Sequence, residues 1–162
     1  MSADKHQPHV LVLPEDDANR QLANGFLLDQ SVSIRRIHVL PVAGGWRKVL
    51  NSFESEHVRE MDRYSKRFMV LLIDFDGHED RLAYAKSVVP VRLIDRVVVL
   101  GVLTEPEDLK KAGFGSYETI GRAMAKDCRE ETDTTWGHDL LRHSAGEIGR
   151  LRDSVRPFLF EI

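Results

Sequence analysis

Three stretches of the chain carry almost unbroken hydrophobic residues, many of them β-branched. They cover residues 10–13, 68–73 and 96–103. Continuous hydrophobicity without alternation is typical of parallel strands that are covered by helices on both faces. A fourth stretch, residues 34–42, is more mixed in polarity, so we expect a strand nearer the edge of the sheet.

Segments with helical periodicity separate these stretches. Asp16 or Asp17 can cap a helix that runs to about Gln30, and residues 45–66 are expected to form one or two helices. Strands that alternate with helices predict right-handed βαβ units. We therefore expect an α/β fold of three layers with a largely parallel central sheet.

The chain beyond residue 103 is predicted to be mainly helical. Apolar positions recur at the helical period in residues 117–128 and in residues 141–155. Residues 157–160 are apolar enough for a short last strand or a strap over the core. No repeat or linker divides the 162 residues, so we predict a single domain, with a core over about 9–112 and a helical extension over about 113–162.

Acidic clusters follow three of the predicted strands: Glu15 to Asp17, Asp74-Phe75-Asp76, and Glu105 to Asp108. Each cluster alone is explained equally well as a helix cap. Because the carboxyl ends of parallel strands meet at the same edge, however, we expect all three to converge in one crevice. Converging carboxylates repel each other unless a cation neutralises them, and Mg²⁺ prefers such oxygen ligands. Strand alternation would turn Asp74 and Asp76 to one side and Phe75 into the structure.

Positive charge is expected at the same edge. Gly44 and Gly45 precede a predicted helix, and Arg47 and Lys48 lie in its first turn. Bare glycine amides with two cations can hold a phosphate, although a plain turn explains two glycines equally well. Trp46 and Trp136 are predicted to be core or interface anchors rather than base-stacking residues.

The overall composition changes this picture little. The chain is 42% hydrophobic and 30% charged, with a formal net charge of −3. This balance excludes a protein that coats nucleic acid through bulk positive charge, but it is compatible with a local basic strip beside an acidic metal site. The apolar runs are too short to span a membrane, no apolar leader is visible, and the single cysteine, Cys128, is expected to be an inert packed thiol. We therefore expect a cytoplasmic protein.

Residues 10–111 resemble a TOPRIM domain, the fold shared by topoisomerases, bacterial primases and OLD-type nucleases. The resemblance rests on Glu15 after the first strand, on Gly44-Gly45, and on Asp74-Phe75-Asp76. It implies Mg²⁺-dependent phosphoryl transfer on DNA or RNA, most simply phosphodiester cleavage, with Mn²⁺ as a possible substitute metal.

The resemblance also implies roles for individual residues. Glu15 would act as general acid or base, Asp74 and Asp76 would hold the metal, and Glu105 or Glu107 would supply a further acid, with Glu107 preferred. Gly44, Gly45, Arg47 and Lys48 would bind substrate phosphates. Two positions depart from the family pattern: Asp16 stands where a glycine is usual, and Asn19 stands where OLD-type nucleases carry a second acid.

Two other functions stay open at this stage. The opening of the chain also resembles a response-regulator receiver, with Asp74 or Asp76 as phosphoacceptor and Thr104 as the hydroxyl after a later strand. Alternatively, a non-catalytic TOPRIM scaffold would bind a separately encoded ATPase, helicase or nuclease. A homodimer is compatible with each of these functions.

Overall fold

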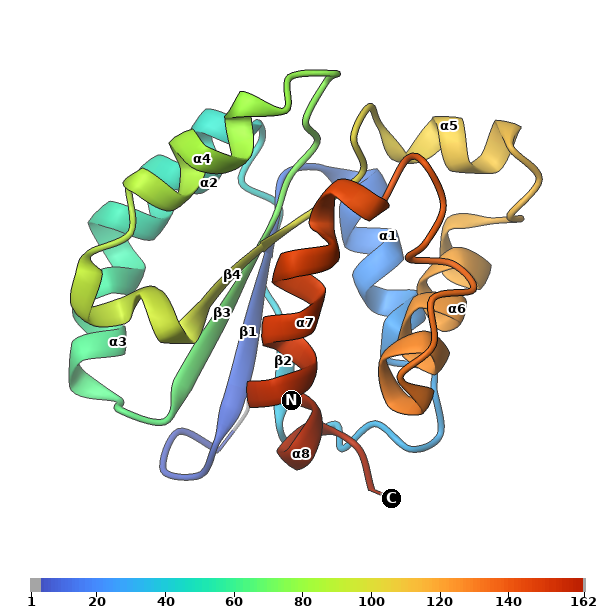
Figure 1. Ribbon diagram of the computed structural model, residues 1–162. Helices are drawn as coiled ribbons and strands as arrows, with labels where there is room; N and C mark the ends of the chain where they lie inside the picture. The colour runs from blue at the N-terminus through green and yellow to red at the C-terminus, as the bar shows by residue number, and fades with distance from the viewer. Residues whose placement is uncertain (1–3, 162) are drawn as a thin grey trace.

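The computed structural model describes residues 4–161 and shows an α/β fold around a four-stranded parallel sheet (Figure 1). The strands are β1 (His9–Pro14), β2 (Ile37–Val39), β3 (Arg67–Leu72) and β4 (Val97–Leu100), in the spatial order β2-β1-β3-β4. The predicted parallel sheet is confirmed, and the stretch of mixed polarity forms the short edge strand β2.

Helices lie on both sides of this sheet (Figure 1). One side carries α2 (Trp46–Ser52), α3 (Val58–Arg63) and α4 (Asp80–Ser87), with a π-helical segment, Phe53–His57, joining α2 to α3. The other side carries α1 (Asp17–Phe26), α5 (Pro106–Lys111), α6 (Tyr117–Glu130), α7 (Ala145–Ser154) and α8 (Arg156–Leu159). Short 3₁₀ segments, Val91–Arg96 and Arg142–Ser144, precede β4 and α7. Every residue of β1 is buried, which explains why its sequence shows no alternation.

The C-terminal helices share their core with the sheet. Helix α6 packs on α1 backbone to backbone: a Cβ atom at Gly121 would lie 2.1 Å from the Leu22 carbonyl oxygen, and one at Gly25 would lie 2.3 Å from that of Glu118. Cys128 on α6 is fully buried, and burial raises the pKa of its thiol to about 11, in agreement with a packed, unreactive residue.

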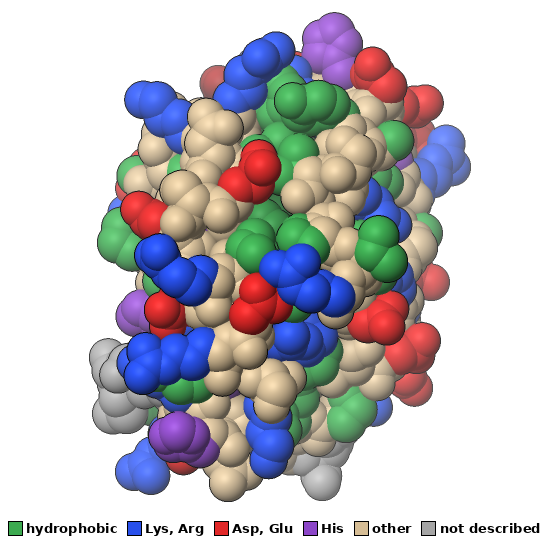
Figure 2. All heavy atoms as spheres, turned by 90° about the vertical axis from the view of Figure 1, so that its left-hand side faces the viewer, with side chains coloured by type: hydrophobic (Ala, Val, Ile, Leu, Met, Phe, Trp, Pro, Cys, Tyr) green, Lys and Arg blue, Asp and Glu red, His purple; other side chains and the backbone are tan. Residues whose placement is uncertain are grey.

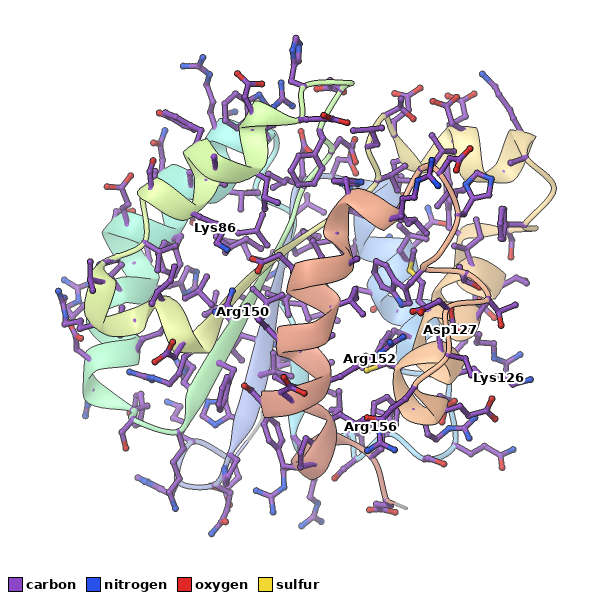
Figure 3. The ribbon with its side chains drawn as sticks, viewed as in Figure 1. Lys86, Lys126, Asp127, Arg150, Arg152 and Arg156 are labelled. Atoms are coloured by element: carbon purple, nitrogen blue, oxygen red, sulfur yellow. The ribbon has the colours of Figure 1, made fainter. Side chains whose placement is uncertain are left out.

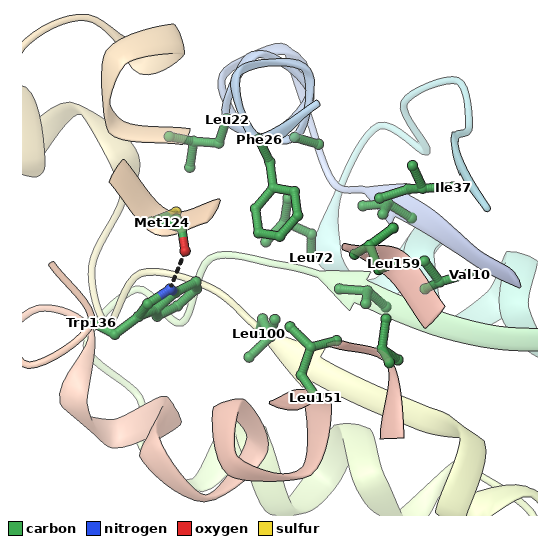
Figure 4. A pocket seen from close by; sticks show the side chains of 14 residues that line it. Val10, Leu22, Phe26, Ile37, Leu72, Leu100, Met124, Trp136, Leu151 and Leu159 are labelled. Carbon is green, nitrogen blue, oxygen red and sulfur yellow. Dashed lines mark hydrogen bonds between the residues drawn. The ribbon is translucent and has the colours of Figure 1, made fainter. Parts of the chain in front are cut away.

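A small apolar cavity of about 60 Å³ lies between the sheet and these helices (Figure 4). Trp136 contributes to its wall, and the indole Nε1 donates a hydrogen bond to the Met124 carbonyl oxygen at 3.2 Å. Trp136 is therefore the core anchor that the sequence predicts.

Helix α7 covers the outer edge of β4. Glu147 accepts a hydrogen bond from the backbone N–H of Val99 at 3.1 Å, and its other oxygen pairs with Arg150 at 2.8 Å and with Lys86 of α4 at 3.4 Å. Figure 3 labels the two cations, Lys86 on α4 and Arg150 on α7. The Ser144 hydroxyl donates to the Gly101 carbonyl oxygen at 3.3 Å. These contacts occupy backbone groups through which an edge strand could otherwise pair with another chain.

Several sequence predictions differ from the observed elements. The first helix ends at Phe26 rather than near Gln30, because the chain turns with the Leu28 N–H bonded to the Gly25 carbonyl oxygen. Of the two alternatives expected for residues 157–160, the strand is wrong: residues 157–159 belong to α8, and Phe160 makes only a single antiparallel bridge with Val32. Leu159 and Phe160 are buried against the core, which agrees with the alternative of a strap over it. Among residues 4–161, no helix is both long and apolar enough to cross a membrane.

Candidate functional site

The candidate site lies at the carboxyl ends of the two central strands. β1 connects to β2 on one side of the sheet, whereas β3 connects to β4 on the other. In open parallel α/β sheets, ligands bind outside the carboxyl ends of the strands at such a point of divergence. Glu15 directly follows β1, and Asp74 comes two residues after β3.

Hydrogen bonds join the acids that follow β1 to those that follow β3. The Glu15 Oε2 atom accepts from the backbone N–H of Asp74 at 2.6 Å. The Asn19 side-chain amide donates to Asp16 Oδ1 at 2.9 Å and to Asp74 Oδ1 at 2.8 Å. Asp16 also caps α1 by accepting from the Asn19 backbone N–H at 3.0 Å, as the sequence predicts. The acids of these two clusters therefore converge.

The two aspartates of Asp74-Phe75-Asp76 have different environments. The extended chain continues past β3 to Phe75, whose N–H donates to the Val102 carbonyl oxygen and whose side chain is fully buried. At Asp76 the backbone turns left-handed, with φ of 49°, and the turn continues through Gly77. Strand alternation thus holds for Asp74 and Phe75 but ends at Asp76. Asp74 is 6% exposed, whereas 52% of the Asp76 side chain is exposed.

Arg81 on α4 holds this turn in place. Its Nη1 atom donates to the Asp74 carbonyl oxygen at 2.8 Å and to Asp76 Oδ2 at 2.7 Å. The guanidinium also stacks over the Trp46 ring, 4.1 Å from its centroid. Sequence reasoning missed Arg81, although a cation five residues after Asp76 in the first turn of the next helix was a usable signal.

Burial and mutual repulsion shift the titration of two carboxyl groups. The pKa of Asp74 is raised to about 7: burial is the main cause, the hydrogen bond from Asn19 opposes the shift, and the charges of Glu15, Asp16 and Asp76 add to it. Burial also raises the pKa of Glu15, against the lowering effect of the Asp74 N–H. The site therefore concentrates negative charge that its own residues neutralise only in part.

Three of the four unpartnered buried polar atoms in the described chain lie at this edge. The buried side-chain atoms without a hydrogen-bond partner in the described chain are Asn19 Oδ1, Thr104 Oγ1, His143 Nδ1 and Arg152 Nε. Asn19 lies in the acidic network, the Thr104 carbonyl oxygen accepts from the Asp76 N–H, and the His143 ring packs 4.7 Å from the Phe75 ring. Such atoms are rare in folded proteins and call for a bound ion, water or function.

The donor set fits a hard divalent cation. Carboxylate oxygens and the free Asn19 carbonyl oxygen are the ligand types that Mg²⁺ and Mn²⁺ prefer. Within residues 4–161, no three His, Cys, Asp or Glu side chains are already grouped as a metal-binding cluster. Mg²⁺ usually keeps several waters and takes only one or two protein carboxylates, so this does not conflict with the fit.

The glycine pair plays a different part from the one expected. The N–H groups of Gly44 and Gly45 both donate to the Glu15 carbonyl oxygen, at 2.8 and 3.2 Å, so these amides are not bare. Both residues have positive φ, 98° and 151°, and let the loop fold back onto the end of β1. Arg47 and Lys48 are exposed and pair with no acidic side chain in the described chain.

The third acidic cluster lies apart from this network. Glu107 is exposed on α5, 3.8 Å from Lys111, and makes no hydrogen bond to the other acids in the described chain. Glu105 stands at the N-cap position of α5 without a capping hydrogen bond. Tyr117 lies between the groups: desolvation raises the pKa of its phenol, and the charges of Glu107, Asp16, Glu105 and Asp74 add to the shift.

Fold and site together define a doubly wound parallel α/β protein with a buried acidic centre at the divergence of its two central strands. No protein-family model, no curated protein sequence and no solved structure matches the chain. The TOPRIM resemblance therefore stays a prediction from the sequence.

Proposed function

We propose that the protein is a Mg²⁺- or Mn²⁺-dependent phosphoryl-transfer enzyme acting on nucleic acid, most simply a phosphodiester-cleaving nuclease. The observation that carries the proposal is the buried pair Glu15 and Asp74, joined through the Asp74 N–H, beside the unpartnered Asn19 carbonyl oxygen. A bound divalent cation would offset the like charges that raise the pKa of Asp74. The resemblance to TOPRIM domains supports the same chemistry.

Each residue then has a chemical task. Asp74 and Asp76 would hold the metal, which supplies electrophilic activation of the phosphate and of a water. Glu15 would carry the proton, because burial raises its pKa towards neutrality, where a carboxyl group transfers protons effectively. Arg81 fixes the Asp76 turn. Arg47 and Lys48 would contact the substrate backbone, and Gly44 and Gly45 would shape the loop that carries them.

Calorimetric metal titration and a cleavage assay test this proposal. We expect wild-type protein to bind Mg²⁺ or Mn²⁺ and to cleave a labelled DNA or RNA oligonucleotide only when the metal is present. Asp74→Asn with Asp76→Asn should abolish both. Asp133→Asn is the matched control, because Asp133 is 71% exposed and pairs with Arg152, away from the site. Unchanged metal binding in the double variant would remove the proposal, and metal binding without cleavage would favour a non-catalytic scaffold.

A receiver-like phosphoacceptor is the second candidate, because Thr104 follows β4 and its hydroxyl is buried without a partner. The sheet order matches the first four strands of the flavodoxin-like arrangement that receivers share. Incubation with a small phosphodonor and intact-mass measurement separates the two candidates. A phosphoryl adduct on the wild type that Asp74→Asn or Asp76→Asn removes would establish the receiver function, and absence of any adduct would exclude it.

A further inference from the structure

An aromatic and cationic group lies beside the acidic edge, on the face that carries α2 and α4. Trp46 begins α2 and Tyr84 lies on α4, and their rings meet edge to face with centroids 5.8 Å apart. Tyr84 is 53% exposed. Figure 2 shows hydrophobic side chains reaching the surface in the upper part of this face, next to Lys and Arg side chains.

Two arginines connect these rings to the acidic site. The Arg81 guanidinium lies 4.1 Å from the Trp46 ring centroid and at the same time binds Asp76 at 2.7 Å. The Arg47 guanidinium lies 5.0 Å from the same ring and is solvent-exposed. Arg81 therefore contacts both the aromatic pair, through Trp46, and the proposed metal ligand Asp76.

We propose that Trp46 and Tyr84 form a stacking surface for an unpaired base, so that the substrate is single-stranded nucleic acid. This inference rests on the proposed function, which supplies a nucleic acid as ligand. Bases of a single strand expose their faces to aromatic rings, whereas a duplex hides its base faces in the stack. Arg47 and Lys48 are placed to contact the phosphates that flank such a base.

The exposure of Tyr84 distinguishes this surface from ordinary core packing. Trp136 is 6% exposed and its indole N–H is bonded inside the core, whereas Trp46 is only partly buried and its neighbour Tyr84 points to solvent. Single-strand binding sites combine exposed aromatic rings with arginines. Here an exposed tyrosine lies beside a partly exposed tryptophan and beside Arg47, which has no acidic partner within residues 4–161. The proposal therefore departs from the expectation that Trp46 is a core or interface anchor rather than a base-stacking residue.

Tryptophan fluorescence of the full chain, without divalent metal, tests the inference. We expect a DNA or RNA single strand of about 12 nucleotides to quench the emission of Trp46 in a Trp136→Phe background and to bind at least about tenfold more tightly than a duplex of equal length. Tyr84→Leu should weaken single-strand binding by roughly 5- to 20-fold, since the variant loses the stacking of one base on an aromatic ring.

Tyr64→Leu is the matched control. Tyr64 also lies among cations, with Lys5, Arg63 and Arg67 over its ring, but at the opposite end of the sheet, beside the start of β3. Its replacement should leave single-strand binding unchanged. Equal binding of duplex, absence of any nucleic-acid binding, unchanged Trp46 emission, or equal losses in the two tyrosine variants would each overturn the inference.

The outcomes also separate this inference from the proposed function. Single-strand binding that quenches Trp46, without cleavage when Mg²⁺ or Mn²⁺ is added, would uphold the stacking surface and contradict the nuclease. Metal-dependent cleavage of duplex alone, with no effect of Tyr84→Leu, would uphold the nuclease and contradict the stacking surface.

Discussion

Two pairs of buried carboxylates in this protein have opposite surroundings. Asp127 and Glu147, both 2% exposed, are surrounded by donors. Asp127 accepts hydrogen bonds from four groups of the following loop, the Thr132 hydroxyl and the backbone N–H groups of Thr134, Thr135 and Trp136. Arg152 donates to the backbone carbonyl oxygens of Asp127 and Thr132 and so connects α7 to the end of α6 and the loop that follows it (Figure 3).

Glu15 and Asp74 are buried almost as deeply, at 8% and 6% exposure, but they lie among other acids. Burial and neighbouring carboxylates raise the pKa of Asp74 to about 7. A fully bonded buried carboxylate stabilises the loops around it, whereas a cluster of incompletely compensated ones costs stability and persists where a function uses it. In this protein the surroundings of a buried carboxylate therefore distinguish structural acids from candidate catalytic acids.

The largest effect is expected at Asp127. Asp127→Ala leaves the donors of residues 132–136 without their acceptor, so the free energy of unfolding should fall by about 3 kcal/mol or more. Urea unfolding followed by circular dichroism measures this. The exposed control Asp133→Ala should lose less than about 1 kcal/mol. A similarly small loss for Asp127→Ala would contradict its structural role.

Asp74→Asn should raise the free energy of unfolding, whereas Asp127→Ala lowers it. The pKa of Asp74 in the folded state lies above the ordinary aspartate value of 3.8, so the folded protein binds the extra proton and loses stability as pH rises from about 4 to about 7. At pH 8 without metal, the variant should be more stable than wild type by about 2 kcal/mol.

The pH dependence provides the check on this gain. The free energy of unfolding of both proteins is measured at pH 8 and at about pH 4. The difference in favour of Asp74→Asn should shrink at the lower pH, where the wild-type carboxyl is protonated in the folded state. A variant that is less stable than wild type at pH 8 would show that the charge of Asp74 is compensated after all.

Glu147→Gln should cause a smaller loss, about 1–2 kcal/mol, because the amide oxygen can still accept from the Val99 N–H while the ion pairs with Lys86 and Arg150 are lost. Thermal unfolding measures it. Added salt should reduce the difference, since Lys86 and Arg150 are partly exposed. If Glu147→Gln were more stable than wild type, the charge of Glu147 would be incompletely compensated, as we infer for Glu15 and Asp74.

Thr104→Val should have the smallest effect. The hydroxyl is buried without a partner, so its replacement by a methyl group should leave stability unchanged or raise it by up to about 1 kcal/mol. Denaturant unfolding measures the change in the free energy of unfolding. The same change is measured for Thr135→Val, at a buried threonine near Asp127, for comparison. A loss above about 1 kcal/mol in Thr104→Val would mean that the hydroxyl has a structural partner.

Much of the fold could be predicted because hydrophobic periodicity reports burial. The continuous apolar runs predicted three parallel strands, and the mixed run predicted the edge strand. α8 was missed because its four residues carry too short a pattern to distinguish a helical turn from a strand. The burial of Glu147 depends on β4, which no local pattern of α7 reveals.

The candidate site was predictable in part for the same reason. Residues that follow parallel strands share an edge, so the convergence of Glu15 with Asp74 was expected from order alone. The contacts of Asn19 and Arg81 could not be predicted, since they depend on how α1 and α4 are placed over the strand ends. The occupied amides of Gly44 and Gly45 also follow from a loop path that the sequence does not specify.

The sequence by itself determined the parallel α/β architecture and the edge at which the acids gather, because strand burial and strand direction follow from the order of apolar and polar residues. Only the tertiary structure decided which acids are compensated. Asp127 and Glu147 meet donors from distant segments, whereas Glu15 and Asp74 meet each other's negative charge in a buried site. The pKa of a carboxyl group depends on its surroundings in space, and those surroundings form only when the chain is folded.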